Sequence, residues 1–314
     1  MRNFIKKYIL FLLTATLFYM AFIIIWGAIF PMNFNKNLNY KLGSIGQMQL
    51  RLDDFRDVGD LDLLFVGSST AYRGFDTRIF EQYNIKSFTL GSSAQTPIQT
   101  KYLLKKYLSQ VDQKLLVIDI NPLMFTIDGV ESSLDLITND EFNLDLVKMV
   151  FEVNHLKVYN TAIYAIYADV FNVHDNFVTP IERDGAKYIS GGFVEHKLSF
   201  YKQVQYSKDR WDFKRKQFMA FNEIIKYLEE NDIYYVVIQS PIVSDLYNSY
   251  INNEELDNFV KDKGKYYNFN KMLSLNDTLH FVDGFHLNQN GVEIYNRKLI
   301  EILEEDIVRI QTNK

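Results

Sequence analysis

The feature that most constrains this sequence is an uncharged apolar stretch near its N-terminus. Residues 8–30 are 23 consecutive positions without a charged side chain, rich in Leu, Ile, Phe and Ala, and Pro31 follows them. A helix of that length reaches about 34 Å, whereas the hydrocarbon core of a bilayer is about 30 Å thick. The stretch therefore predicts a transmembrane helix.

The charges around this stretch predict its orientation. Basic side chains precede it at Arg2, Lys6 and Lys7, and the next one downstream is Lys36. This bias favours a cytoplasmic N-terminus and an extracytoplasmic remainder. A cleaved signal peptide would have a shorter apolar core and a small-residue cleavage site, and a buried core helix would usually show a polar face. We therefore expect residues 1–32 to form an uncleaved, single-pass anchor in the cell membrane.

The remainder of the chain is mildly acidic and contains no cysteine. Residues 31–314 carry 31 basic and 39 acidic side chains, so nucleic acid is not an expected partner. The absence of cysteine excludes a disulfide framework, a thiol nucleophile and thiolate metal sites. Hydrophobic residues make up 47% of the chain, which is enough for a packed core and excludes disorder as the main state.

Beyond the apolar stretch, short buried strands alternate with amphipathic helices. The expected strands lie at residues 61–67, 85–90, 115–120, 233–238 and 279–282. The expected helices begin near Pro97, Trp211 and Asn288. This alternation predicts an α/β fold with a doubly wound, flavodoxin-like parallel sheet that is covered by helices on both faces.

Two segments do not follow the alternation. Residues 33–60 are largely polar and predict a linker between the anchor and a domain over 61–310. After the third strand, residues 123–210 are rich in Tyr and Phe, and we interpret them as a helical, aromatic insertion above the C-terminal edge of the sheet. The insertion is either a lid over a substrate or a packed subdomain.

Small and polar residues follow the strands at the edge where such sheets bind ligands. Ser69 follows the first strand, Gly91 the second and Asn121 the third, whereas Asp283 and His286 precede the last helix. A serine hydroxyl becomes a nucleophile when a histidine accepts its proton and an aspartate stabilises the imidazolium. Backbone N–H groups of Ser69 and Gly91, together with the Asn121 amide, are suited to hold an oxyanion. These positions predict a Ser-His-Asp triad.

Each of these signals has a structural alternative. A serine at this position can simply cap the helix after a strand. The Asp-x-x-His pattern occurs twice, and the copy from Asp277 to His280 lies in the expected fifth strand, where we interpret it as structural. A metal site built from both copies is a third possibility, but a strand and a loop would have to bring four ligands within about 2.2 Å of one ion. We expect neither a metal nor an organic cofactor.

These blocks, in this order and on these elements, resemble the SGNH (GDSL-like) hydrolase superfamily. The matching positions are Gly67-Ser68-Ser69, Gly91, Asn121, and Asp283 with His286. The resemblance implies an SGNH-type fold with Ser69 as the nucleophile. Two departures stand out: Ser68 replaces the usual Asp, and Asp119-Ile120-Asn121-Pro122 stands in place of Gly-x-Asn-Asp. The resemblance covers residues 60–122 and 211–310, and it leaves the insertion unmatched.

The Gly-Ser-Ser block, the single span and the outward domain look like one branch of that superfamily. Its members are membrane-anchored proteins similar to those that help to D-alanylate teichoic acids or acetylate alginate. The resemblance implies a serine O-acyltransferase or esterase that acts on acyl groups of an extracytoplasmic glycan or teichoic acid, beside a polytopic membrane-bound O-acyltransferase. The alternative is a catalytically silent protein that binds the polymer or recruits the transferase.

Overall fold

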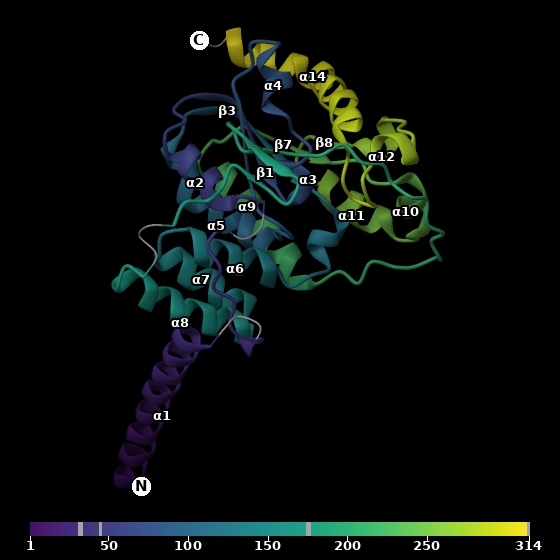
Figure 1. Cartoon of the computed structure of the whole chain (residues 1–314). Helices are drawn as coiled ribbons and strands as arrows, with labels where there is room; N and C mark the ends of the chain where they lie inside the picture. Colours follow the sequence, from purple (N-terminus) through teal and green to yellow (C-terminus); the bar gives the residue numbers. More distant parts are fainter. Residues whose placement is uncertain (31–33, 44–45, 174–176, 313–314) are drawn as a thin grey trace.

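The computed structural model describes residues 1–30, 34–43, 46–173 and 177–312. Helix α1, Arg2–Ile29, projects from the rest of the molecule as a separate rod (Figure 1). Within the described ranges it is the one helix long and apolar enough to cross a membrane, with a mean hydropathy of 2.4, and 6% of its most apolar window is buried. These properties fit the expected single-pass anchor, and they equally fit a signal sequence.

Five parallel strands form the central sheet in the order β2-β1-β3-β7-β8. They are β1 Leu61–Gly67, β2 Ser87–Gly91, β3 Gln113–Ile120, β7 Tyr235–Gln239 and β8 Tyr266–Asn268. The chain places β2 on one side of β1 and then crosses to β3 on the other side, so the winding direction reverses between β1 and β3. The prediction of a doubly wound, flavodoxin-like parallel sheet is confirmed.

Alternate side chains of β1 enter two hydrophobic cores, one on each face of the sheet, because successive strand residues point in opposite directions. Leu64 and Val66 pack with α5 and α9, whereas Leu63 and Phe65 pack with α4 and α14. The helices around the sheet are α3 Ser69–Tyr72, α4 Thr77–Glu81, α5 Pro97–Tyr107, the 3-10 helix η2 Leu108–Gln110, α9 Arg215–Glu230, α10 Ser244–Ser249, α11 Asn253–Lys261, α12 Phe269–Met272, α13 Asp277–His280 and α14 Gln289–Thr312.

The fifth strand does not lie where the sequence predicts it. The expected strand at 279–282 is wrong, because α13 ends at His280 and Phe281 makes only an isolated bridge. The side chain of Asn276 accepts the N–H of Leu279 at 3.0 Å, and this cap starts a helical turn instead of a strand. The three-residue β8 takes the fifth position, and a strand this short leaves no apolar run for a sequence pattern to detect.

The insertion after β3 contains helices and a small antiparallel sheet. Its elements are the 3-10 helix η3 Pro122–Phe125, α6 Val130–Asn139, α7 Leu144–Val153, α8 Leu156–Val170, β4 Glu182–Arg183, β5 Ala186–Ile189 and β6 Phe193–His196. The turn between β5 and β6 reaches the outer side of β2, where the N–H of Thr89 donates to the carbonyl of Gly191 at 2.8 Å. A Cβ at Gly192 would lie 2.1 Å from the Thr89 oxygen, and the φ angle there is +90°, so this position requires glycine.

The segment 33–60, which the sequence suggests as a linker, carries helix α2, Met48–Arg56. Arg51 of this helix is fully buried, and its guanidinium donates to the carbonyls of Gly91 at 2.8 Å and Gly192 at 2.9 Å. A buried cation is tolerated only when its donors are satisfied. Arg51 therefore joins α2, the end of β2 and the insertion into one folded unit.

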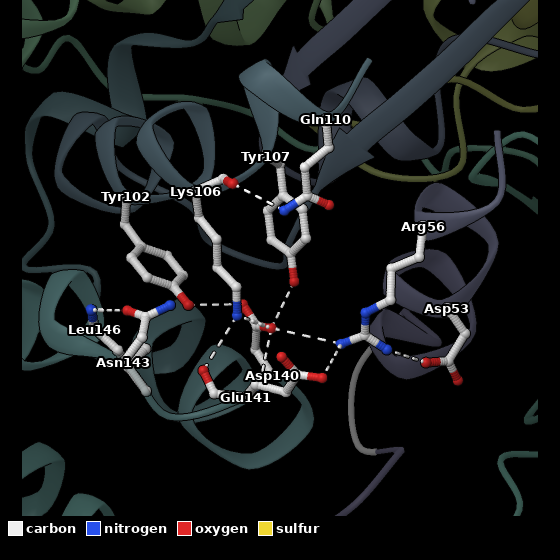
Figure 2. A network of polar contacts seen from close by, with 10 residues as sticks. All are labelled: Asp53, Arg56, Tyr102, Lys106, Tyr107, Gln110, Asp140, Glu141, Asn143 and Leu146. Atoms are coloured by element: carbon white, nitrogen blue, oxygen red, sulfur yellow. Dashed lines mark hydrogen bonds and ion pairs between the residues drawn. The ribbon is translucent and has the colours of Figure 1, made fainter. Parts of the chain in front are cut away.

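A buried carboxylate at the end of α6 joins several elements of the fold (Figure 2). Asp140 accepts the hydroxyls of Tyr102 at 2.6 Å and Tyr107 at 2.5 Å, and the Nζ of Lys106 at 2.5 Å. Arg56 at the end of α2 lies 3.8 Å from the same carboxylate. Burial and the charge of Asp140 raise the pKa of both tyrosines above their ordinary value, so both hydroxyls stay protonated and donate. Asp140 thus connects α2, α5 and α6.

We expect Asp140→Ala to lower the free energy of unfolding by about 3–5 kcal/mol, because it leaves a lysine and two buried hydroxyls without their acceptor. Equilibrium urea unfolding of the detergent-solubilised chain, followed by near-UV circular dichroism, measures this change. The matched control is Asp145→Ala, which removes a half-exposed carboxylate paired with Lys148 and is expected to cost less than about 1 kcal/mol. Equal losses for the two variants would contradict a structural role of the Asp140 network.

Candidate active site

The residues predicted after the strands meet at the carboxyl edge of the sheet. Ser69 is the first residue of α3, and its Oγ lies 2.8 Å from Nε2 of His286, which is 217 positions downstream. Nδ1 of His286 lies 2.8 Å from Oδ2 of Asp283 and 2.9 Å from Oδ1. The structure thus brings the three predicted triad residues into one hydrogen-bonded chain.

The Asp283 carboxylate also folds the loop that carries His286. Its Oδ1 accepts the backbone N–H groups of Phe285 and His286, both at 2.9 Å. An aspartate that bonds to N–H groups two and three residues further on closes a tight turn. The spacing Asp-x-x-His therefore places the imidazole against the same carboxylate that fixes its loop.

The electrostatics of the triad favour a neutral imidazole beside a charged carboxylate. Burial lowers the pKa of His286 below its ordinary value, even though the hydrogen bond to Asp283 works in the opposite direction. Burial also opposes ionisation of Asp283, but the hydrogen bond and charge interaction with His286 outweigh it and lower the pKa of Asp283 to about 2. The Arg73 cation lowers both pKa values further. At neutral pH, Nε2 of His286 is therefore able to accept a proton.

A second carboxylate, Asp119, holds the turn that carries Ser69. It is fully buried, and it accepts the hydroxyls of Thr70 and Ser240, each at 2.6 Å. Burial raises the pKa of Asp119 to about 6, although both hydrogen bonds oppose the rise. Because Thr70 follows β1 and Ser240 follows β7, this side chain of β3 ties three strand ends together. This role was not predicted from the sequence. The signal for it is the presence of a carboxylate inside an otherwise apolar strand.

The three predicted oxyanion donors lie at the ends of adjacent strands. Gly91 pairs in register with Gly67, and a Cβ at Gly91 would lie 2.5 Å from the Gly67 oxygen, so the close approach of β1 and β2 requires glycine there. Asn121 is buried, and its Oδ1 accepts the N–H of Leu123 at 2.9 Å as the cap of η3. The donor roles of Ser69, Gly91 and Asn121 toward an oxyanion stay predictions.

Ser69 and His286 line a pocket of about 300 Å³. One wall comes from the strands of the insertion, and another comes from the segment that precedes α2. The lining residues are Gly43, Gly46, Gln47, Ser69, Tyr72, Arg73, Ser93, Arg183, Asp184, Ala186, His196 and His286. The insertion therefore covers the side of the triad on which a substrate would enter, and a pocket of this size accommodates a small acyl or sugar unit.

Among the other titratable residues of this pocket, Arg73 and His196 interact with the charge of His286, and the sequence predicted neither of them. Arg73 follows Ser69 by four positions, a spacing that places both on one side of a helical turn and was an available signal. His196 comes from β6, and burial together with the Arg73 charge lowers its pKa to about 4, so it is neutral at pH 7. The irregular sequence pattern of the insertion gives no signal for His196.

The side chains considered as metal ligands have separate roles. Among the described residues, no group of three His, Asp or Glu side chains lies close enough to hold an ion. Asp277 accepts the N–H of Ser244 at 2.9 Å, and Nδ1 of His280 accepts the N–H of Asn276 at 3.0 Å. The first Asp-x-x-His copy therefore connects neighbouring loops, while the second copy supplies Asp283 and His286 of the triad.

Comparisons with known proteins do not place the chain in a family. No protein-family model matches it, and no curated protein matches it. Among solved structures, a candidate acylhydrolase from Bacteroides fragilis NCTC 9343 shows 10% sequence identity and a TM-score of 0.43, and a GDSL-like lipase from Bacteroides thetaiotaomicron VPI-5482 shows 10% and 0.42. Both alignments cover 83% of this chain and 98% of the other. Similarity at this level carries no argument about activity, so the site is judged by its geometry.

The protonation states predict how the reactivity of Ser69 depends on pH. Because only the neutral form of His286 accepts the serine proton, and its pKa lies below 6.5, the rate of Ser69 modification by a fluorophosphonate should rise with pH, pass its midpoint below pH 6.5 and level off by pH 7. Rates measured between pH 5 and 8 test this expectation. A midpoint above pH 6.5 would contradict the neutral, buried imidazole.

Proposed function

We propose that this chain is a membrane-anchored serine O-acyltransferase or esterase that acts on acyl groups of an extracytoplasmic glycan or teichoic acid. The observation that carries the proposal is the chain of hydrogen bonds from Ser69 through His286 to Asp283. A serine, a histidine and an aspartate in this order form the constellation that performs acyl transfer on several unrelated folds. The proposal is therefore based on geometry and on the role of each group, independently of any overall similarity.

In the proposed reaction, Oγ of Ser69 attacks the carbonyl carbon of an ester while Nε2 of His286 takes its proton. Asp283 stabilises the imidazolium, and N–H donors at the ends of β1 and β2 stabilise the oxyanion. The leaving alcohol takes the proton from His286, and the acyl group remains on Ser69. An acceptor hydroxyl then gives its proton to His286 and takes the acyl group, which regenerates the serine. No metal or organic cofactor enters this scheme.

The acceptor hydroxyl decides between transfer and hydrolysis. Water gives an esterase, and a sugar or polyol hydroxyl gives a transferase; we propose transfer as the main outcome. The pocket beside Ser69 supports a carbohydrate or polyol acceptor, because its wall offers arginine, histidine, serine and glutamine side chains for hydroxyl recognition. Product analysis with an acylated donor and a sugar acceptor separates the two outcomes.

The anchor supports a role at the membrane surface. Helix α1 is apolar and exposed, and the three basic residues at its N-terminal end favour a cytoplasmic N-terminus with the domain outside. Confinement near the bilayer raises the effective concentration of lipid-linked donors and nascent polymers. We propose a polytopic membrane-bound O-acyltransferase as the partner that supplies the acyl group.

We expect a fluorophosphonate probe to label the wild-type chain on Ser69 and not to label Ser69→Ala. His286→Ala should slow labelling by about a thousandfold, because the serine loses its general base. Ser274→Ala, which removes an exposed hydroxyl outside this pocket, is the matched control and should label like the wild type. Mass spectrometry of the labelled peptide gives the measurement.

Equal labelling of wild type and Ser69→Ala would reject Ser69 as the nucleophile. Polymer acylation in cells distinguishes the silent-partner alternative. If Ser69→Ala leaves acylation intact while replacement of α1 by an unrelated span abolishes it, the chain recruits a transferase and performs no chemistry itself.

A further inference from the structure

Arg73 brings a positive charge to the reacting serine. It is the C-cap residue of α3, one turn beyond Ser69, and it lines the pocket that holds Ser69 and His286. Its charge acts on the pKa of both His286 and Asp283, so the guanidinium lies within electrostatic range of the triad.

The guanidinium of Arg73 is poorly satisfied within the protein. Its Nε is buried without a hydrogen-bond partner, and none of the described carboxylates forms an ion pair with it. Other buried or pocket arginines differ: Arg51 donates to backbone carbonyls, and Arg183 pairs with Asp184. Arg73 is half-buried and also lines the pocket, and a partly desolvated guanidinium without a protein acceptor is costly unless a ligand supplies one.

Neighbouring groups do not fill this role. Asp283 interacts with Arg73 through its charge, but its oxygens already accept the imidazole and two backbone N–H groups. His196 shares the pocket and is a neutral donor or acceptor at pH 7, because its pKa is about 4. The pocket therefore offers a cation and a neutral imidazole beside the nucleophile.

We propose that Arg73 is an anion subsite that binds a carboxylate or phosphate group of the substrate next to the reacting acyl group. The planar guanidinium matches either oxyanion with two parallel hydrogen bonds, which fixes the orientation of the ester at Ser69. The proposal deepens the proposed function and rests on it: the substrate class becomes acyl esters that carry an anionic group, a carboxylate or a phosphate, within reach of Arg73.

Protection of Ser69 from a neutral alkyl fluorophosphonate tests the subsite in the full-length chain. The rate of labelling is measured with and without inorganic phosphate, glucuronate or glucose, and the ratio of the two rates gives the protection. Wild type should be protected by phosphate or glucuronate and not by glucose. For half-maximal protection, Arg73→Gln should require an anion concentration about tenfold or more above that of wild type. Arg73→Lys should require a smaller increase than Arg73→Gln. The exposed Arg210→Gln should require the same concentration as wild type.

The outcomes distinguish a phosphate group from a carboxylate group on the substrate. They also distinguish failure of the anion subsite from failure of the proposed function. Protection by phosphate alone assigns a phosphate-bearing substrate, and protection by glucuronate alone assigns a carboxylate. Protection that is absent in wild type, or unchanged in Arg73→Gln, overturns the subsite while labelling of Ser69 still supports the proposed function. A wild-type chain that does not label at all rejects the proposed function and the subsite with it.

A second, independent observation concerns the place where α1 meets the domain. Helix α8 crosses the second half of α1 at the end of the domain from which α1 projects (Figure 1). The Tyr19 hydroxyl donates to Oδ1 of Asn160 at 2.7 Å, and Ile23 packs against Tyr164. A Cβ at Gly27 would lie 2.5 Å from the Tyr164 ring, so the two helices touch closely.

The depth of this contact follows from the length of α1. If the hydrocarbon core begins after Lys7, about 20 helical residues cross its roughly 30 Å and reach Gly27. The contact with α8 begins at Tyr19, which is 12 residues or about 18 Å above Lys7. The crossing point therefore lies at the depth of the outer leaflet.

The outward side of α8 has the composition that this depth requires. Ile166 and Val170 of α8, together with Phe171 directly after it, form an exposed apolar stripe, with exposed fractions of 41%, 68% and 68%. No charged residue lies between Lys157 and Asp169. We infer that α8 is immersed in the outer leaflet, where lipid acyl chains cover this stripe, an inference that rests on α1 spanning the membrane.

Depth-dependent quenching tests this inference, because the chain has no native cysteine. Single variants Ile166→Cys, Phe171→Cys, Leu13→Cys on α1 and Ile294→Cys on the distant α14 receive an environment-sensitive fluorophore in liposomes with nitroxide-labelled lipids. We expect quenching at 166, 171 and 13, and none at 294.

Quenching at 13 without quenching at 166 and 171 would overturn the immersion of α8 while leaving the anchor in place. An apolar emission at 166 and 171 without lipid quenching would overturn it as well, because protein instead of lipid would then cover the stripe. Absence of quenching at 13 would reject the span itself and, with it, the inference.

Discussion

The Asp119 carboxylate lies without solvent contact at the end of β3, where Thr70 and Ser240 donate to it. A buried carboxylate without partners would cost several kcal/mol, so folding brings the ends of β1, β3 and β7 together around this group. Thr70 is the next residue after Ser69. The position of the proposed nucleophile therefore depends on Asp119. This side chain belongs to neither hydrophobic core and is not a member of the triad.

The rest of the site is supplied by segments that are far apart in the sequence. The loop before α14 delivers His286 to the sheet edge, and Asp283 fixes both the loop and the ring. The buried Arg51 connects α2 and the insertion to the end of β2, which positions the wall opposite the triad. Geometry and charge then act together: burial keeps the imidazole neutral, and the nearby Arg73 favours that state further.

The parts of the fold predicted from the sequence are those that follow a regular pattern. The apolar run at 61–67 predicted β1. Because the carboxyl ends of parallel strands lie at one edge of the sheet, the same topology predicted that Ser69 lies near His286 and Asp283. The doubly wound, parallel arrangement of the sheet followed from the alternation of strands with helices. These inferences needed only periodicity, turn residues and connectivity.

The parts that were missed depend on tertiary contacts. The strand β8 is too short to show a pattern, and α2 is a largely polar helix that fully buries the charged Arg51. The small sheet of the insertion and the pocket residue His196 depend on packing against the main sheet, which no local signal in 123–210 encodes. Asp119 illustrates the same limit, because its role depends on hydroxyls from two other segments.

The contact between Thr89 and Gly191 has a consequence for how copies of the chain behave when they are crowded. β2 is an outer strand of the main sheet, and such a strand offers free N–H and C=O groups to any extended peptide. The diglycine turn takes the outward N–H of Thr89, and Gly192 fits directly against the carbonyl of the same residue. Strand addition from a neighbouring molecule is thereby hindered at this position, which disfavours self-association of the chain through the edges of its sheets.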